Sequence, residues 1–200
     1  MIARTLLAGL VALFFLGSAY QAPVLGASKK GTLPPVFLSQ ESLRASMQGF
    51  SGIALDLNGD GNDDLVVGAP YANHKHASGA LLVYFATPKG LFPSRPSAVI
   101  EGNGTLGWSL AALGDVNADG KGDFAAGAVN GDGENVSLSG TVTIYRSGDK
   151  PQILEGENAL DRFGYVLASG DLNGDGKSDL IVGSPLHSPS PQLYQQGAVY

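Results

Sequence analysis

A nine-residue acidic motif occurs three times in this chain and limits what the chain can fold into. The copies read DLNGDGNDD, DVNADGKGD and DLNGDGKSD, and they occupy residues 56–64, 115–123 and 171–179. Each copy has oxygen-bearing side chains at positions 1, 3, 5 and 9 and a glycine at position 6. With this spacing, a tight loop directs alternate side chains toward one hard divalent cation. The copies begin 59 and 56 residues apart, so the loop is part of a repeating structural unit.

The predicted ion is Ca²⁺, with one structural ion in each loop and about three in the chain. Asp-Gly and Asn-Gly pairs also form ordinary turns, but a turn needs only one or two such residues. Three carboxylates packed together without a cation would repel one another. Magnesium fits less well because it keeps its waters. The predicted ligands are the side chains at positions 1, 3, 5 and 9 and the backbone carbonyl at position 7: Asp56, Asn58, Asp60, Asn62, Asp64, Asp115, Asn117, Asp119, Lys121, Asp123, Asp171, Asn173, Asp175, Lys177 and Asp179.

The loops differ from the helix–loop–helix type of calcium site. The twelfth positions are Val67, Ala126 and Val182, so no glutamate is present to bind the ion with two oxygens. The flanking segments are short apolar runs of the kind that form strands. We therefore expect a β-hairpin loop in which the aspartate at position 9 takes the two-oxygen role.

Each repeating unit has the size and content of a propeller blade. A segment with glycine and an aromatic residue precedes the acidic loop, an apolar run follows it, and a strand that opens with glycine comes last. The 29 glycines and 11 prolines predict frequent turns between short strands. A unit of about 58 residues with some four strands indicates an all-β propeller, with about three blades in residues 37–200.

The stretch FGYVLASGDLNGDGKSDLIVGSP at residues 163–185 resembles the FG-GAP repeat of integrin α-subunit β-propellers. The same repeat occurs in glycosylphosphatidylinositol-specific phospholipase D and in bacterial surface proteins. The resemblance covers about residues 50–200. The first copy has Phe50-Ser51-Gly52 where Phe-Gly is expected, and the second has Leu106-Gly107 and later Gly127-Ala128-Val129.

The resemblance implies a seven-bladed propeller in which calcium fixes the hairpin loops on one face, while partners bind mainly at the opposite face and its rim. About three blades fall within this sequence, which stops inside a strand that the earlier units complete. We therefore expect a partial propeller, a fragment whose remaining C-terminal blades belong to the same polypeptide.

The N-terminus has the pattern of a secretory signal peptide. Arg4 precedes an apolar run at residues 6–16, and Gly17-Ser18-Ala19 supplies small residues for cleavage. The alternative, a membrane anchor, requires about 20 apolar residues. We expect a signal peptide at residues 1–19, a linker at residues 20–36, and a secreted or cell-surface protein without a transmembrane segment.

Composition excludes several classes of function. The net charge of −6 gives no basic surface for nucleic acid. The chain has no cysteine, so it lacks disulfides, thiolate metal sites and cysteine nucleophiles. Integrin α propellers usually carry disulfides, so this departure favours a divergent or bacterial member. We expect solvated loops for His74, His76 and His187, and possible glycosylation sequons begin at Asn103 and Asn135.

The resulting expectation is a calcium-binding scaffold that binds an extracellular protein or glycan ligand in adhesion and is not an enzyme. The first alternative is an accessory propeller of a secreted hydrolase, such as a glycosylphosphatidylinositol-specific phospholipase D, whose catalytic residues would lie outside this chain. The second is a structural surface repeat that has no specific ligand.

Overall fold

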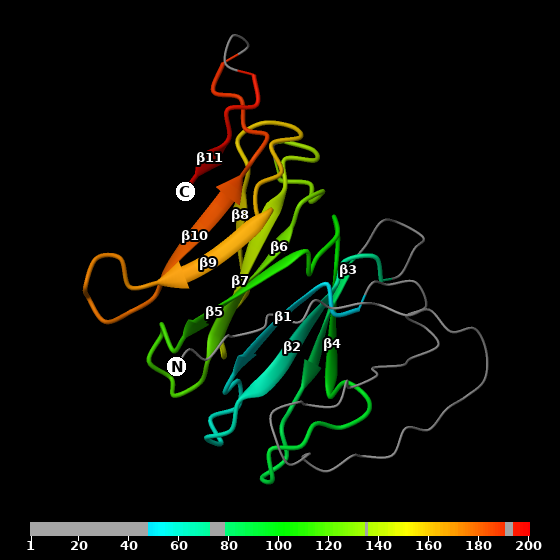
Figure 1. The fold of residues 1–200 in the computed structure, drawn as a ribbon, viewed down its shortest axis with the longest axis vertical. Coiled ribbons are helices and arrows are strands. Elements are labelled where there is room, and N and C mark those ends of the chain that lie inside the picture. The colour runs from blue at the N-terminus through cyan, green and yellow to red at the C-terminus, as the bar shows by residue number, and fades with distance from the viewer. Residues whose placement is uncertain (1–47, 73–78, 135, 191–193) are drawn as a thin grey trace, which may run out of the picture. The chain divides into compact units, whose positions relative to one another are not determined.

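The protein is built from three antiparallel β-sheets. The computed structural model describes residues 48–72, 79–134, 136–190 and 194–200 (Figure 1). Within these ranges the regular secondary structure consists of β-strands alone. The sheets have the strand orders β1-β2-β3-β4, β5-β6-β7-β8 and β11-β10-β9. The strands are β1 (Ser51–Leu55), β2 (Asp64–Ala69), β3 (Gly79–Tyr84), β4 (Ala98–Gly102), β5 (Ser109–Gly114), β6 (Asp123–Ala128), β7 (Thr141–Tyr145), β8 (Gln152–Glu155), β9 (Val166–Gly170), β10 (Asp179–Ser184) and β11 (Ala198–Val199). The all-β fold and the three blades are confirmed.

Part of the predicted organisation falls outside these ranges. The signal peptide at residues 1–19, the linker at residues 20–36 and the first part of the predicted blade region lie outside the described residues. Within the part that is described, no helix is long and apolar enough to cross a membrane.

The first two sheets pack face to face through a shared apolar core. Leu55, Val66 and Leu81 of the first sheet form one cluster with Phe124 and Ala126 of the second. Val66 and Leu81 are fully buried because the acidic hairpin runs directly into the apolar strand β2, which pairs with the equally apolar β3. Burial of such side chains contributes about 1.5–3 kcal/mol each.

The second and third sheets repeat this arrangement. Ala125 of β6 and Val142 of β7 share a cluster with Phe163 and with Val182 of β10. The first strands of the three sheets, β1, β5 and β9, lie beside one another in sequence order (Figure 1). The sheets therefore follow one another as propeller blades do.

Two pairs of glycines bring neighbouring blades into direct backbone contact. A Cβ on Gly68 would lie 2.1 Å from the carbonyl oxygen of Gly107, and a Cβ on Gly127 would lie 2.3 Å from that of Gly164. Gly107 and Gly164 have φ angles of 91° and 81°, which only glycine adopts readily. The two halves of the FG-GAP motif thus meet across the junction between blades, where no side chain fits.

A serine hydroxyl strengthens each of these junctions. Ser51 Oγ donates to the carbonyl oxygen of Gly107 at 2.7 Å, and Ser109 Oγ donates to that of Gly164 at 2.6 Å. The two bonds occupy equivalent positions because Ser51 pairs with Gly68 in the register of β1 and β2, as Ser109 pairs with Gly127 in β5 and β6.

The aromatic residues of the repeats form a row across the three blades. The ring centroids of Phe50 and Trp108 are 4.7 Å apart, and those of Trp108 and Tyr165 are 5.5 Å apart. The register aligns Gly49-Phe50 with Gly107-Trp108 and Gly164-Tyr165. The expected match of Phe50-Ser51-Gly52 to Phe-Gly is therefore wrong, and Gly49 is the motif glycine of the first copy.

The contact between blades predicts different outcomes for two glycines of the first sheet. Gly68→Ala should lower the free energy of unfolding by about 1–3 kcal/mol because its methyl group would overlap the Gly107 carbonyl. Gly52→Ala is the matched control, because a Cβ there lies 3.7 Å from its nearest neighbour. Urea denaturation of the full chain, followed by Trp108 fluorescence, measures both. Equal stability of the two variants would contradict the packing.

Candidate functional site

The three acidic loops join the first and second strands of their sheets. They connect β1 to β2, β5 to β6 and β9 to β10, so each leaves the same end of its sheet. The aromatic row precedes β1, β5 and β9 and therefore lies at their other end. The acidic loops and the aromatic row are thus at opposite edges of the blades.

The aspartate at position 1 organises each loop by accepting backbone hydrogen bonds. Asp56 Oδ1 accepts from the amides of Gly59 at 2.8 Å and Asp60 at 3.2 Å, and its Oδ2 accepts from Gly61 at 2.7 Å. These bonds, above all that from Gly61, hold the pKa of Asp56 below its usual value. The carboxylate is thus kept in its charged form.

The third loop repeats this arrangement. Asp171 Oδ1 accepts from Gly174 at 2.7 Å and Asp175 at 3.1 Å, and Oδ2 accepts from Gly176 at 2.9 Å. The pKa of Asp171 is lowered mainly by the Gly176 amide. In the second loop, Asp115 accepts from the Asp119 amide at 3.0 Å and from the Gly120 amide at 2.8 Å.

Positions 3 and 5 continue the turn. Asn58 Oδ1 accepts from the Asp60 amide at 2.8 Å, and Asp60 Oδ1 accepts from the Asn62 amide at 2.8 Å and from its side chain at 2.9 Å. The Asn62 side chain is the main cause that lowers the pKa of Asp60. The equivalent backbone bonds recur in the other two loops: Asp119 to Asn117 at 3.3 Å, Lys121 to Asp119 at 2.9 Å, Asp175 to Asn173 at 2.8 Å and Lys177 to Asp175 at 2.9 Å.

Position 4 differs among the loops. Gly59 and Gly174 both have a φ of 79°, whereas the second loop has Ala118 there with a φ of 61°. A left-handed backbone costs a residue with a Cβ roughly 1–2 kcal/mol. The second loop therefore adopts the common turn at a higher backbone energy than the other two.

The aspartate at position 9 has a structural role that the sequence did not reveal. Asp64 is fully buried, and its Oδ2 accepts from the Leu57 amide at 3.1 Å while Oδ1 accepts from the Ala86 amide at 2.8 Å. Burial raises the pKa of Asp64 despite these bonds. The carboxylate thus fastens the loop to the chain that leaves β3.

The second blade repeats both bonds, and the third blade repeats the bond within the loop. Asp123 is fully buried and accepts from the amides of Val116 at 3.0 Å and Ser147 at 3.3 Å. Asp179 accepts from the Leu172 amide at 2.9 Å. Position 9 therefore closes each loop onto its position 2.

The side chains of each loop supply carboxylate and amide oxygens, which are the ligand types that Ca²⁺ prefers. In the described residues, no three His, Cys, Asp or Glu side chains come together as a group that could hold a metal ion. The carboxylates accept from backbone amides instead: Asp56 from amides of its own loop, and Asp64 from Leu57 in the loop and from Ala86 beyond β3.

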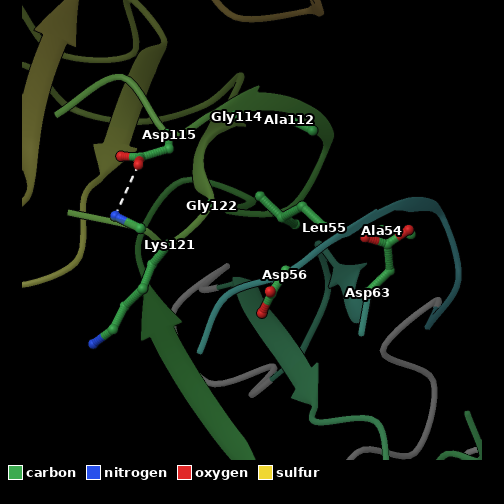
Figure 2. Close-up of a pocket in the computed structure, with 10 residues that line it drawn as sticks. Ala54, Leu55, Asp56, Asp63, Ala112, Gly114, Asp115, Lys121 and Gly122 are labelled. Carbon is green, nitrogen blue, oxygen red and sulfur yellow. Dashed lines mark hydrogen bonds between the residues drawn. The ribbon is translucent and has the colours of Figure 1, made fainter. Parts of the chain in front are cut away.

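The first two loops lie against each other across the blade junction. The Gly122 amide donates to the Asp56 carbonyl at 2.6 Å. A hollow of about 480 Å³ lies here, lined by both loops, with Asp56 on one side and Asp115 on the other (Figure 2). Lys121 extends away from the Asp115 carboxylate. In the next junction, Lys177 Nζ donates to the Val116 carbonyl at 3.1 Å.

The prediction of a solvated loop is wrong for one histidine. His187 was expected in a solvated loop, but it is only 7% exposed, and its Nδ1 lies 2.7 Å from Oδ2 of the buried Asp161. The two residues are 26 positions apart, and nothing in the sequence signals that they pair. His74, His76 and the sequon residue Asn135 lie outside the described residues, and Asn103 is exposed.

Comparison with known proteins agrees with this architecture. The family model described as FG-GAP repeat matches residues 49–84 and 163–200. Integrin alpha-7 of Mus musculus is 39% identical over 164 residues, which covers 76% of this chain and 13% of the integrin. Integrin alpha-3 of Cricetulus griseus is 37% identical over 195 residues, covering 82% of this chain and 18% of the integrin.

A second group of relatives has the name of an enzyme. Phosphatidylinositol-glycan-specific phospholipase D of Homo sapiens is 34% identical over 156 residues, which covers 68% of this chain and 18% of the enzyme. The chain thus spans less than a fifth of the length of these relatives. The blade junctions explain the matched motif, because its glycines are the residues that meet there. The chain is an FG-GAP repeat protein whose β-propeller blades are similar to a region of integrin α-subunits and of phosphatidylinositol-glycan-specific phospholipase D.

Proposed function

We propose that this chain is a calcium-stabilised β-propeller scaffold, secreted or exposed at the cell surface, that binds an extracellular protein or glycan ligand in adhesion. The observation that carries the proposal is the recurrence of one loop turn in all three blades of a chain that is 39% identical to an integrin α-subunit over 164 residues. Its two parts, the ion and the ligand, rest on different residues.

The ions would be held by the oxygens of the acidic loops. Positions 1, 3, 5 and 9 supply side-chain oxygens and position 7 a carbonyl, as in Asp56, Asn58, Asp60, Asp64 and Asn62 of the first loop. Bound calcium would offset the repulsion among the carboxylates, so its binding free energy would add to the stability of the blade.

The ligand would bind at the opposite edge of the blades. Phe50 and Tyr165 are 41% and 40% exposed although their rings are within reach of Trp108. Aromatic side chains are enriched at the centres of protein interfaces because they bury a large area at a small entropic cost. The row therefore supports a binding surface away from the acidic loops.

A second candidate is supported by the phospholipase relatives. Their similarity over 68% of this chain fits an accessory propeller that accompanies a hydrolase domain. In that case the blades would still act by binding. Hydrolysis of a phosphatidylinositol-glycan substrate by the purified chain would contradict both candidates.

Calcium binding should be measurable by isothermal titration calorimetry. We expect about three ions for each chain and a higher melting temperature in calcium than in EGTA, because the ions bind only the folded loops. Asp60→Ala, Asp119→Ala and Asp175→Ala should each remove one site. Asp149→Asn, which changes an exposed carboxylate outside the loops, is the control. A folded protein that releases no heat with calcium would contradict the proposal.

Two aspartates of the first loop should respond differently when calcium is removed. In EDTA, Asp64→Asn should lower the free energy of unfolding by about 1–3 kcal/mol, because an amide cannot accept both buried backbone bonds. Asp60→Asn should change it by less than about 0.5 kcal/mol, since this side chain is exposed. Urea denaturation measures both, and the reverse order would show that position 9 is not structural.

The aromatic row can be tested with beads that carry the full chain. Such beads should adhere to plates coated with extracellular-matrix proteins in calcium, and Trp108→Ala should reduce adhesion about tenfold by removing the central ring. Phe85→Ala is a matched control, because Phe85 is 39% exposed and follows β3 at the edge with the acidic loops. Equal loss in the two variants would place the binding surface elsewhere.

A further inference from the structure

The second blade has two glycines where the connection from the preceding blade crosses its outer hairpin loop. A Cβ on Gly104 would lie 2.2 Å from both Cα and N of Gly131, so neither position has space for a side chain. The amide of Asn130 donates to the Gly104 carbonyl at 2.9 Å and fixes the crossing.

The third blade repeats this crossing with different side chains. The Leu186 amide donates to the Asp161 carbonyl at 3.2 Å, as the corresponding amide does in the second blade. This correspondence places Asp161 where the second blade has Gly104, and His187 where it has Gly131. A tight glycine contact is thus replaced by a pair of titratable side chains.

The two side chains form a buried hydrogen bond. Asp161 is 2% exposed and His187 is 7% exposed, and Oδ2 of Asp161 lies 2.7 Å from Nδ1 of His187. The same oxygen accepts from the backbone and side-chain nitrogens of Asn158, at 3.1 and 3.2 Å. An ionised carboxylate can only accept hydrogen bonds, so with Asp161 ionised the donor in this bond is Nδ1–H of His187.

The other ring nitrogen faces a second carboxylate. Nε2 of His187 is 3.9 Å from Oε2 of Glu157, whose side chain is 63% exposed. On the remaining side, the ring of Tyr200 stands edge-on with its centroid 6.2 Å from that of the imidazole. Burial and the nearby negative charges raise the pKa of Tyr200, so its hydroxyl stays protonated. The charged groups about the imidazole are therefore Asp161 and Glu157, with Arg162 next to Asp161 in the same connection.

We propose that Glu157, Asp161 and His187 form a proton-responsive clamp that holds the connection between β8 and β9 against the loop between β10 and β11. A neutral imidazole has one N–H for two carboxylates, and its bare Nε2 lone pair faces Glu157. An imidazolium has two N–H groups and can donate to both. Proton uptake therefore tightens the crossing, a regulation that goes beyond the scaffold function proposed above and does not depend on calcium.

A hollow lies beside the clamp. The hollow has a volume of about 370 Å³ and is lined by both clamped segments, including Asp161, Leu186 and Tyr194. Two residues of the connection, Leu160 and Arg162, line it with left-handed φ angles of 66° and 60°. Such conformations persist only where the surroundings fix them.

Amide hydrogen exchange of the full chain tests the clamp and carries an internal control. Between pH 7.5 and 5.5, the protection factor of the Leu186 amide, corrected for intrinsic exchange, should rise roughly tenfold as a charged hydrogen bond forms. The equivalent Asn130 amide of the second blade, at the glycine crossing, should not change. Equal changes in protection at both amides, or no change at Leu186, would overturn the proposal. The measurement uses the unmodified chain, so it does not depend on the folding of a variant.

Two variants then assign the effect. Glu157→Gln, at an exposed position, should remove most of the pH response at Leu186 while leaving its protection at pH 7.5 unchanged. His187→Gln should remove the response entirely. Asp149→Asn is the matched control and should keep the full response. Persistence of the response in both Glu157→Gln and His187→Gln would show that another group binds the proton, and the clamp would be refuted.

Discussion

The glycine contact between blades is the constraint on which the rest of the structure depends. Where the Gly107 carbonyl approaches Gly68, and the Gly164 carbonyl approaches Gly127, the backbones of adjacent blades are closer than any side chain would allow. The serine hydroxyls donate hydrogen bonds across the same junctions, and the apolar clusters pack between the same sheets. The rings of Phe50 and Trp108 lie tilted against each other with their centroids 4.7 Å apart. The glycines of the FG-GAP motif are thus required sterically, because a side chain at these positions would keep the two sheets apart.

Much of this architecture could be predicted because it rests on local signals. The apolar runs after each acidic loop form strands, the loops form hairpins, and their spacing gives the number of blades. The role of Asp64 could not be predicted in this way, because one of its two partners is the amide of Ala86, 22 residues away and without any distinguishing side chain. A sequence pattern identifies which side chains carry oxygens but not which backbone amides those oxygens will accept.

The failures have the same physical origin. His187 lies among serines and prolines, so composition predicts a solvated loop, and only the crossing of two distant segments buries it against Asp161. The motif glycine of the first copy was misplaced because Phe50 has glycines nearby on both sides, and the strand register was needed to select Gly49. Both errors concern pairings across a sheet or a junction, which local residue preferences do not encode.

Ala118 shows that the repeats are chemically alike but not energetically equal. Its left-handed backbone makes the middle loop the most strained of the three, although its residues at positions 1, 3, 5 and 9 match those of its neighbours. The second blade is also the only one of the three with a described neighbour on both sides. The acidic loop with the highest backbone energy therefore belongs to the blade that packs against a neighbour on each side. The contacts with these two blades can offset the conformational energy of Ala118.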